Sequence, residues 1–453
     1  MNERDASLME VLDNRERRVQ RQNRLLEAFS HTLICLTLNI PGPRKNNALI
    51  ASGFRLGRRQ LLDVLRSSGI PVLHREEISE VTGCEGFYVV DGPADKVKDL
   101  TVWLEDSSEF GRLLDVDVLT AEGGKLSRST GRNCLICGKP ASVCGPARAH
   151  SATELWQRTK EILEAAVWTD RARYIGAMAA KSLLYEVCVT PKPGLVDRVN
   201  SGAHRDMDIF TFMASTAALQ PYFTDCAQIG LTTREQEARE TFRQLRLRGM
   251  LAEQEMLRHT GGVNTHKGAI FSLGLACAAA GRLGGAAPLA PEAVLSQCAA
   301  MTCGITEQDF RKVTAETART AGEQFYARFG ITGIRGQAEA GFPAVTQWGL
   351  PALEQGLAMG HSMDRAGGAA LLAILAHTDD TNLIARSDRE TQQKTAESVA
   401  ALLQRDPCPD EAALASLDRA FIEKNLSPGG SADLLALTLL IHFLSQTNQE
   451  EIL

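Results

Sequence analysis

Hydrophobic and polar residues alternate in two different ways along the chain, and the change falls near residue 150. Before it, a helix-periodic charged segment covers about residues 6–29 and a second covers about 55–68, with strand-like runs at 32–40, 86–92 and 113–119. These short β-rich runs are bounded by Gly, Asp and Pro, as strands usually are. The pattern predicts an α/β domain over residues 1–153.

After residue 154 the strand-like runs nearly vanish, and long Ala- and Leu-rich segments with helical periodicity follow, at about 175–187, 207–223, 266–283, 366–380 and 431–444. Their near-continuous apolar character indicates helices that are buried on most sides. We therefore predict an all-α domain over residues 154–453. The join lacks a Pro-, Gly- or Ser-rich linker, so the two domains are expected to pack together or to share a helix.

Composition narrows the class of protein. The chain is 44% hydrophobic and 23% charged. It contains no apolar run of about 18 residues and no secretory signal, which predicts a cytoplasmic protein without a membrane span. Residues 1–150 carry 21 Lys and Arg against 20 Asp and Glu, and a nucleic-acid binder would be more basic. The eleven scattered cysteines are expected to be thiols unless a metal holds them.

Polar residues of the helical half gather in four loops that feed helices. A helix N-terminus favours anions, and Mg²⁺ readily bridges carboxylates to a polyphosphate, so the loops predict a nucleoside triphosphate site. No G-x4-GK[ST] motif is present, which excludes a P-loop. Any single aspartate in these loops could instead cap a helix without binding a ligand. The candidates are Lys192, Asp206 and Asp208 in the first loop, Asn264, His266 and Lys267 in the second, Asp379 and Asp380 in the third, and Gly429 and Gly430 in the fourth.

The same four loops carry a family resemblance. The segments "VTPKPGLVDRVNSGAHRDMDIFTFMAS", "GGVNTHKGAIFSLGL", "HTDDTN" and "SPGGSADLLA" resemble the triphosphoribosyl-dephospho-CoA synthase family over about residues 155–453. The resemblance implies a reaction of ATP with 3'-dephospho-CoA that releases adenine. It implies metal-ligand or base roles for Asp379, Asp380 and Asp206 or Asp208. Lys192, His266 and Lys267 would bind phosphates, and the choice of base stays open.

In the first half, Asp115 and Asp117 lie two residues apart in the apolar run "GRLLDVDVL". Alternate residues of a strand share a face, so both carboxylates are expected to point the same way and to form a candidate Mg²⁺ site. Further on, Cys134, Cys137, Cys144 and His150 have zinc-ligand spacing. They predict either a structural Zn²⁺ site or a packed loop of reduced thiols.

A second resemblance covers about residues 6–155. The opening helix with "RERRVQRQ", the segment "CLTLNIPGPRKNN" and the segment "RNCLICGKPASVCGPARAHS" resemble the apo-citrate lyase phosphoribosyl-dephospho-CoA transferase family. This implies nucleotidyltransferase-like chemistry, in which a serine of the apo acyl carrier subunit of citrate lyase receives the precursor and pyrophosphate leaves. Phosphate contacts are then expected from Arg15, Arg18, Arg44, Lys45 and Arg148.

Two alternatives stay open at this point. Maturation of malonate decarboxylase would use a synthase with the same helical motifs. The N-terminal half distinguishes this system from citrate lyase, because it resembles the citrate lyase transferase. A zinc-knuckle binding module on a helical scaffold would predict stoichiometric zinc and a basic surface. The near-neutral first half and the Asp115–Asp117 pair argue against this second alternative.

Overall fold

The computed structural model describes residues 4–286 and 288–446, which fold as two compact units. The first unit ends at Thr169 and the second begins at Asp170, so the boundary falls inside helix α5 (Ala152–Cys188). The sequence pattern predicts the boundary at residues 153/154, near the start of this helix. A shared helix was one of the two expected kinds of join. No described helix has the length and apolar character that a membrane span requires.

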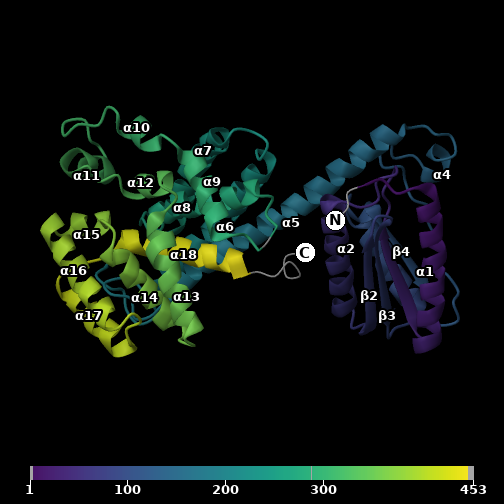
Figure 1. The fold of residues 1–453 in the computed structure, drawn as a ribbon, viewed down its shortest axis with the longest axis horizontal. Helices are drawn as coiled ribbons and strands as arrows, with labels where there is room; N and C mark the ends of the chain where they lie inside the picture. The colour runs from purple at the N-terminus through teal and green to yellow at the C-terminus, as the bar shows by residue number, and fades with distance from the viewer. Residues whose placement is uncertain (1–3, 287, 447–453) are drawn as a thin grey trace. The chain divides into compact units, whose positions relative to one another are not determined.

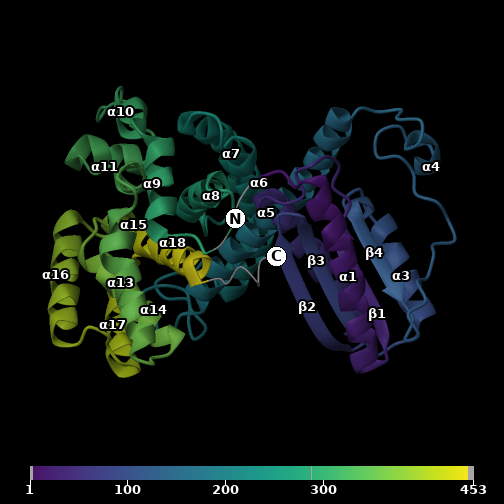
Figure 2. The same ribbon diagram turned by 45° about the vertical axis from the view of Figure 1, so that its right-hand side comes forward.

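The N-terminal unit is built on a four-stranded antiparallel sheet with strand order β2-β3-β1-β4 (Figure 2). Without the leading helix, its element order is β-α-β-β-α-β, the split βαβ arrangement. The elements are α1 (Leu8–Phe29), β1 (Thr32–Leu38), α2 (Ala48–Ser67), β2 (Val72–Glu80), β3 (Gly83–Val90), α3 (Ala94–Asp106), the 3-10 turn η1 (Gly111–Leu113), β4 (Leu114–Leu119) and α4 (Ala141–Cys144).

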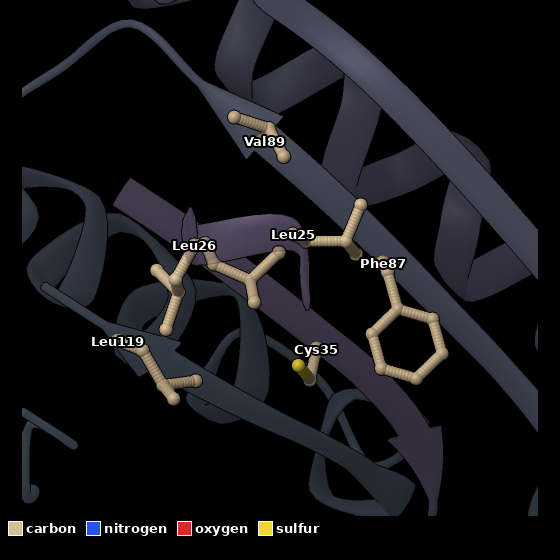
Figure 3. Close-up of a cluster of buried hydrophobic side chains, with 7 residues drawn as sticks. Leu25, Leu26, Cys35, Phe87, Val89 and Leu119 are labelled. Atoms are coloured by element: carbon tan, nitrogen blue, oxygen red, sulfur yellow. The ribbon is translucent and has the colours of Figure 1, made fainter. Parts of the chain in front are cut away.

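Helix α1 covers one face of this sheet, and α2 lies on the other side (Figure 1). Alternation along the strands explains this layering, because every second side chain points to the same face. Figure 3 shows the cluster under α1, which consists of Leu25, Leu26, Leu33, Cys35, Phe87, Val89 and Leu119. On the opposite face, Leu114 of β4 packs against Gly57 of α2. The sheet is thus buried on both sides, and α1 begins at a capping box formed by Ser7 and Glu10.

The second unit is helical throughout its described residues. Besides the C-terminal part of α5, it contains α6 (Ile209–Thr232), α7 (Ala238–His259), α8 (Lys267–Arg282), α9 (Pro291–Thr302), α10 (Ile305–Phe310), α11 (Ala321–Phe329), α12 (Gly333–Glu339), the π-helical turn η2 (Val345–Gly349), α13 (Leu350–Ala358), α14 (Met363–Ala376), α15 (Thr381–Arg386), α16 (Arg389–Arg405), α17 (Glu411–Glu423) and α18 (Gly429–Gln446).

Helices α8, α14 and α18 form the centre of this unit, and α18 packs against both α8 and α14 (Figures 1 and 2). Ten consecutive residues of α14, from Ala366 to Leu375, are buried. In α8 the buried residues extend from Ala269 to Gly281 almost without interruption. The near-continuous apolar runs of the sequence therefore correspond to helices enclosed by other helices, as predicted.

Gly230 of α6 marks a close crossing of α6 and α8, because a Cβ there would lie 2.1 Å from the Ala278 carbonyl oxygen. We expect Gly230→Ala to force the helices apart and lower the free energy of unfolding by about 1–3 kcal/mol. Gly249→Ala on α7 is the matched control, since its Cβ would meet the nearest atom at 3.6 Å. It should raise stability by about 0.5–1 kcal/mol. Urea unfolding measures both effects, and equal midpoints would contradict the close crossing.

Candidate active sites

The helical unit contains a cavity of about 1090 Å³, at the upper end of the size of small-molecule sites. Its wall is formed by segments that lie far apart in the sequence. Eight of the ten residues predicted for this half line it: Lys192, Asn264, His266, Lys267, Asp379, Asp380, Gly429 and Gly430. Asp206 and Asp208 are not among the lining residues, although their neighbours His204 and Met207 are. The four loops therefore meet at one place.

Asp379 and Asp380 occupy different environments. Asp380 is buried and its carboxylate caps α15, accepting hydrogen bonds from the backbone N–H groups of Asn382 and Leu383 at 3.0 and 3.1 Å. It also accepts from the backbone N–H and the hydroxyl of Ser431 at 2.7 and 2.8 Å. Asp379 is exposed in the cavity, and no described residue pairs with it. Of the two carboxylates, Asp379 alone is available to a ligand.

His266 lines the cavity, and its two ring nitrogens have different surroundings. The Thr265 hydroxyl donates to Ser215 Oγ at 2.8 Å, and Ser215 Oγ lies 2.7 Å from His266 Nδ1. Ser215 therefore donates to Nδ1, and this assigns the ring hydrogen to Nε2. Nε2 is buried and has no hydrogen-bond partner among the described residues. Burial, helped by the nearby Lys192, lowers the pKa of His266 to about 3, so the ring is neutral at pH 7.

This pKa makes stability depend on pH. The unfolded His266 takes up a proton near pH 6.5 and the folded one only near pH 3, so stability is complete above pH 6.5 and falls as the pH drops below it. Between pH 6.5 and 5.0 we expect a loss on the order of 2 kcal/mol from this group. His266→Gln should remove that part of the slope. Urea unfolding at the two pH values tests this, and identical slopes for both proteins would refute it.

A buried carboxylate of the cavity wall, Glu186, lies outside the four loops predicted from the sequence. The ammonium of Lys192, expected to bind phosphate, pairs with the buried carboxylate of Glu186 on α5. Asp433 of α18 packs against Gly268 at the start of α8, where an added Cβ would lie 2.0 Å from Asp433 Oδ2. Burial, and then the neighbouring Glu186 and Asp380, raises the pKa of Asp433 well above its usual value. The wall thus combines an ion pair with a buried carboxyl whose pKa is raised.

The first loop is held by two further carboxylates. Asp197 accepts from the backbone N–H groups of Lys192, Val199 and Asn200 at 2.7 to 3.0 Å. Asp418 of α17 accepts from Gly194 N–H at 2.9 Å. Asp208, a possible base in the sequence analysis, caps α6 through Thr211, and these hydrogen bonds lower its pKa. Asp197, Asp418 and Asp208 therefore shape the loop.

Cations on the cavity wall also come from segments that lack the glycine-loop signature. Arg335 of α12, Arg386 of α15 and Arg389 of α16 line the cavity. Arg386 donates to the Ala203 carbonyl oxygen at 2.9 Å and to His204 Nδ1 at 3.0 Å. Arg386 thus fixes the first loop. Lys267, which also lines the cavity, forms an ion pair with Glu253 at 3.0 Å. An arginine within an amphipathic helix gives no sequence signal that it faces a ligand.

In the N-terminal unit, Asp115 and Asp117 lie on one face of β4, opposite Thr37 and Cys35 of β1, and both are half-exposed. The residues between and after them, Val116 and Val118, are buried on the other face. The shared face agrees with the predicted strand geometry. Asp117 pairs with Lys125 at 2.7 Å and Asp115 with Arg132 at 3.3 Å, so each carboxylate already has a cationic neighbour.

The basic residues predicted for this unit are dispersed. Arg18 of α1 donates to Glu85 Oε1 at 2.9 Å through Nε, and Glu85 is buried under the helix on the same sheet face as Asp115 and Asp117. Arg44 is exposed and pairs with Asp5 at 3.0 Å. Lys45 donates to the Ile40 carbonyl oxygen at 2.5 Å, and Arg15 is exposed. The structure thus brings Arg18, but not Arg44, to the face that carries the Asp pair.

Arg148 lines a second cavity of about 1060 Å³ in the N-terminal unit. Three arginines that the sequence analysis did not name, Arg112, Arg128 and Arg132, also line it. The buried carboxylate of Glu105 holds two of them, with Arg132 at 2.5 Å and Arg128 at 3.4 Å. Cys134, Cys144 and His150 belong to the same wall, so the cysteine segment and the arginines form one structure.

Comparisons with known families agree with this division. The family model described as apo-citrate lyase phosphoribosyl-dephospho-CoA transferase matches residues 6–166. The family model described as ATP:dephospho-CoA triphosphoribosyl transferase matches residues 172–452. Both resemblances stated from the sequence motifs are thereby confirmed, and the chain is a transferase with two activities.

Relatives that combine both segments extend over almost the whole chain. A protein of Haemophilus influenzae named Protein CitXG is 35% identical and covers 97% of this chain and 96% of its own. One of the same name from Leuconostoc mesenteroides subsp. cremoris is 36% identical and covers 96% of each. A 2-(5''-triphosphoribosyl)-3'-dephosphocoenzyme-A synthase of Pectobacterium atrosepticum is 42% identical over 60% of this chain and 91% of its own. The chain therefore belongs to the CitXG family, which joins a phosphoribosyl-dephospho-CoA transferase segment to a triphosphoribosyl-dephospho-CoA synthase segment.

Proposed function

We propose that the helical unit converts ATP and 3'-dephospho-CoA into 2'-(5''-triphosphoribosyl)-3'-dephospho-CoA and adenine, and that the N-terminal unit transfers this product to a serine of the apo acyl carrier subunit of citrate lyase. The observation that carries the first half is the meeting of the four loops around one cavity with carboxylates, cations and helix N-termini. Such a wall suits a triphosphate and a second nucleotide.

In the synthase step, the ribose 2'-oxygen of dephospho-CoA bonds to C1' of ATP while the bond from C1' to adenine breaks. The hydroxyl loses a proton, adenine gains one, and positive charge develops on the ribose as in glycoside cleavage. Asp379 is the carboxylate we assign to the reacting hydroxyl, because it is exposed in the cavity while Asp380 is saturated by hydrogen bonds. Asp380 then positions Asp379 by fixing the start of α15.

Other residues of the wall hold and orient the substrates. His266 offers a neutral Nε2–H donor to a nucleotide acceptor, and Lys267, Arg335 and Arg389 provide positive charge for phosphates. Asp433, whose pKa is raised by burial and by the neighbouring Glu186 and Asp380, is a candidate acid for the departing adenine. The carboxylate of Asp379 would hold a Mg²⁺ ion, and that ion would supply positive charge against the phosphates.

Incubation with ATP, 3'-dephospho-CoA and Mg²⁺ tests this assignment. We expect one adenine for each triphosphoribosylated product, measured by chromatography and mass spectrometry, and omission of dephospho-CoA should abolish adenine formation. Release of ADP or pyrophosphate in place of adenine would show that a different bond of ATP is broken and would reject the proposal.

In the transferase step, the carrier serine oxygen attacks the α-phosphorus of the triphosphoribosyl group, and the bond to the outgoing pyrophosphate breaks. The two carboxylates on one strand face, Asp115 and Asp117, would hold a Mg²⁺ ion, which would supply positive charge for the phosphates. Arg18 on the same face and Arg148 in the second cavity are the proposed phosphate contacts. This chemistry is nucleotidyltransferase-like.

The match of residues 6–166 to an apo-citrate lyase transferase favours citrate lyase over malonate decarboxylase as the recipient. The two systems can be separated by offering each apo carrier protein to the enzyme with the purified intermediate. We expect a mass increase of the citrate lyase carrier alone. Equal modification of the malonate decarboxylase carrier would overturn the choice.

A further inference from the structure

We propose that Cys134, Cys137, Cys144 and His150 bind one structural Zn²⁺ ion, and that this ion closes the segment from residue 131 to 150 into the wall of the arginine-lined cavity. The three sulfur atoms and one ring nitrogen all lie within 4.8 Å of one another. This proposal rests on the donor set and its geometry, so it stands apart from the proposed reactions.

The distances suit tetrahedral zinc. Zn–S bonds of about 2.3 Å place the sulfur atoms of a tetrahedral site roughly 3.8 Å apart. Cys137 Sγ and Cys144 Sγ are 3.4 Å apart, and both are free thiols. Three thiols and an imidazole form a complete four-ligand set, which is typical of a structural site and leaves no open position for a substrate.

The first pair of ligands lies on a tight turn. The Ile136 backbone N–H donates to Cys134 Sγ at 3.5 Å, and Gly138 N–H donates to the Cys134 carbonyl oxygen at 3.2 Å. Gly138 has φ of 71°, a left-handed conformation that favours glycine. This backbone turns Cys137 back beside Cys134.

A second, independent observation comes from His150. Its Nε2 is buried and makes no hydrogen bond to any described residue. A buried polar atom without a partner is destabilising, and a bond to a metal ion would offset that cost. The imidazole is part of the four-residue cluster, so its unsatisfied nitrogen points to the same ligand as the thiols.

The segment closed by these residues carries two of the four arginines that line the second cavity, Arg132 and Arg148. Arg132 pairs with Glu105 at 2.5 Å and with Asp115 at 3.3 Å. Arg112 donates to the carbonyl oxygens of Asn133 and Cys134 at 3.0 and 2.9 Å. Arg148 lies two residues before the last ligand. Zinc would therefore fix Arg132 and Arg148 at the two ends of one loop.

The test uses the full chain purified without a histidine tag after growth with zinc. Elemental analysis should find one zinc per chain, and Co²⁺ exchanged into the site should give thiolate-to-cobalt charge transfer and the d–d bands of a tetrahedral ion. Cys137→Ser should lose the metal. Cys303→Ser, at an exposed cysteine of the helical unit, is the matched control and should keep it.

Two further measurements keep the outcome decisive if Cys137→Ser folds poorly. Cys137→His should retain one metal ion with a cobalt spectrum of fewer thiolates. Chelation should speed tryptic cleavage at Arg132, Lys139 and Arg148 at least tenfold, and added zinc should reverse it. Wild-type protein without zinc and without thiolate–cobalt bands would overturn the proposal, as would equal metal loss from the Cys303→Ser control.

Discussion

Replacing Asp379 by asparagine is expected to slow adenine release by about 10²–10⁴-fold, the range in which loss of an acid–base group falls. Asparagine keeps the size of the side chain but cannot accept the proton or bind Mg²⁺ as a carboxylate does. Because Asp379 is exposed in the cavity, with no partner in the described part of the chain, the variant should unfold at the wild-type urea concentration. Initial rates of adenine formation at saturating substrate measure the effect.

Two further variants are compared with Asp379→Asn. Asp225→Asn, on the exposed side of α6, is the matched control and should leave the rate unchanged. Asp380→Asn should lower both rate and stability, since its carboxylate caps α15 and binds Ser431 of α18. If Asp379→Asn retains most of its activity, the assignment of the reacting carboxylate is wrong.

Asp115→Asn and Asp117→Asn are expected to reduce carrier modification by about 10²–10³-fold while adenine release stays at the wild-type rate. Each change removes negative charge from the β4 face where we place the metal, and neither side chain touches the helical cavity. The readout is the mass of the apo acyl carrier protein after incubation with purified intermediate. Pyrophosphate release gives an independent measure.

Asp99→Asn, at an exposed position of α3, serves as the control within the same unit. It should modify the carrier normally. Loss of the Lys125 and Arg132 ion pairs in the two test variants is a separate effect, and urea unfolding reports it. Normal carrier modification by both test variants would exclude the Asp115–Asp117 face as the transferase site.

Much of the helical cavity could be predicted because its polar residues occupy loops with their own sequence signature. Glycine and proline mark where a helix begins, and Asn264, His266, Asp379 and Gly429 follow that signal. Glu186 gives no such signal, because it lies within the apolar helical run of α5. It pairs with Lys192, which lies in the loop that follows this helix. Arg335 and Arg389 likewise reach the cavity only through the packing of short helices.

Three of the four strands of the sheet could be predicted, because they too have a recognisable sequence pattern. Buried strands β1, β3 and β4 have apolar residues in short runs, and the i, i+2 rule placed Asp115 and Asp117 on one face. Strand β2, with the sequence "VLHREEISE", was missed because it lies at the edge of the sheet and is mostly polar. Helix α2 begins at Ala48, seven residues before the predicted start, because Asn47 caps it.

The relay of the intermediate between two single-site variants tests the central claim most directly. Asp115→Asn is incubated with ATP, 3'-dephospho-CoA and Mg²⁺, and the product is isolated and given to Asp379→Asn with apo acyl carrier protein. We predict that Asp115→Asn releases adenine, that Asp379→Asn then modifies the carrier and releases pyrophosphate, and that Asp379→Asn alone cannot use ATP and 3'-dephospho-CoA. An unmodified carrier in the second step, or no adenine in the first, would contradict two separable sites that act in sequence.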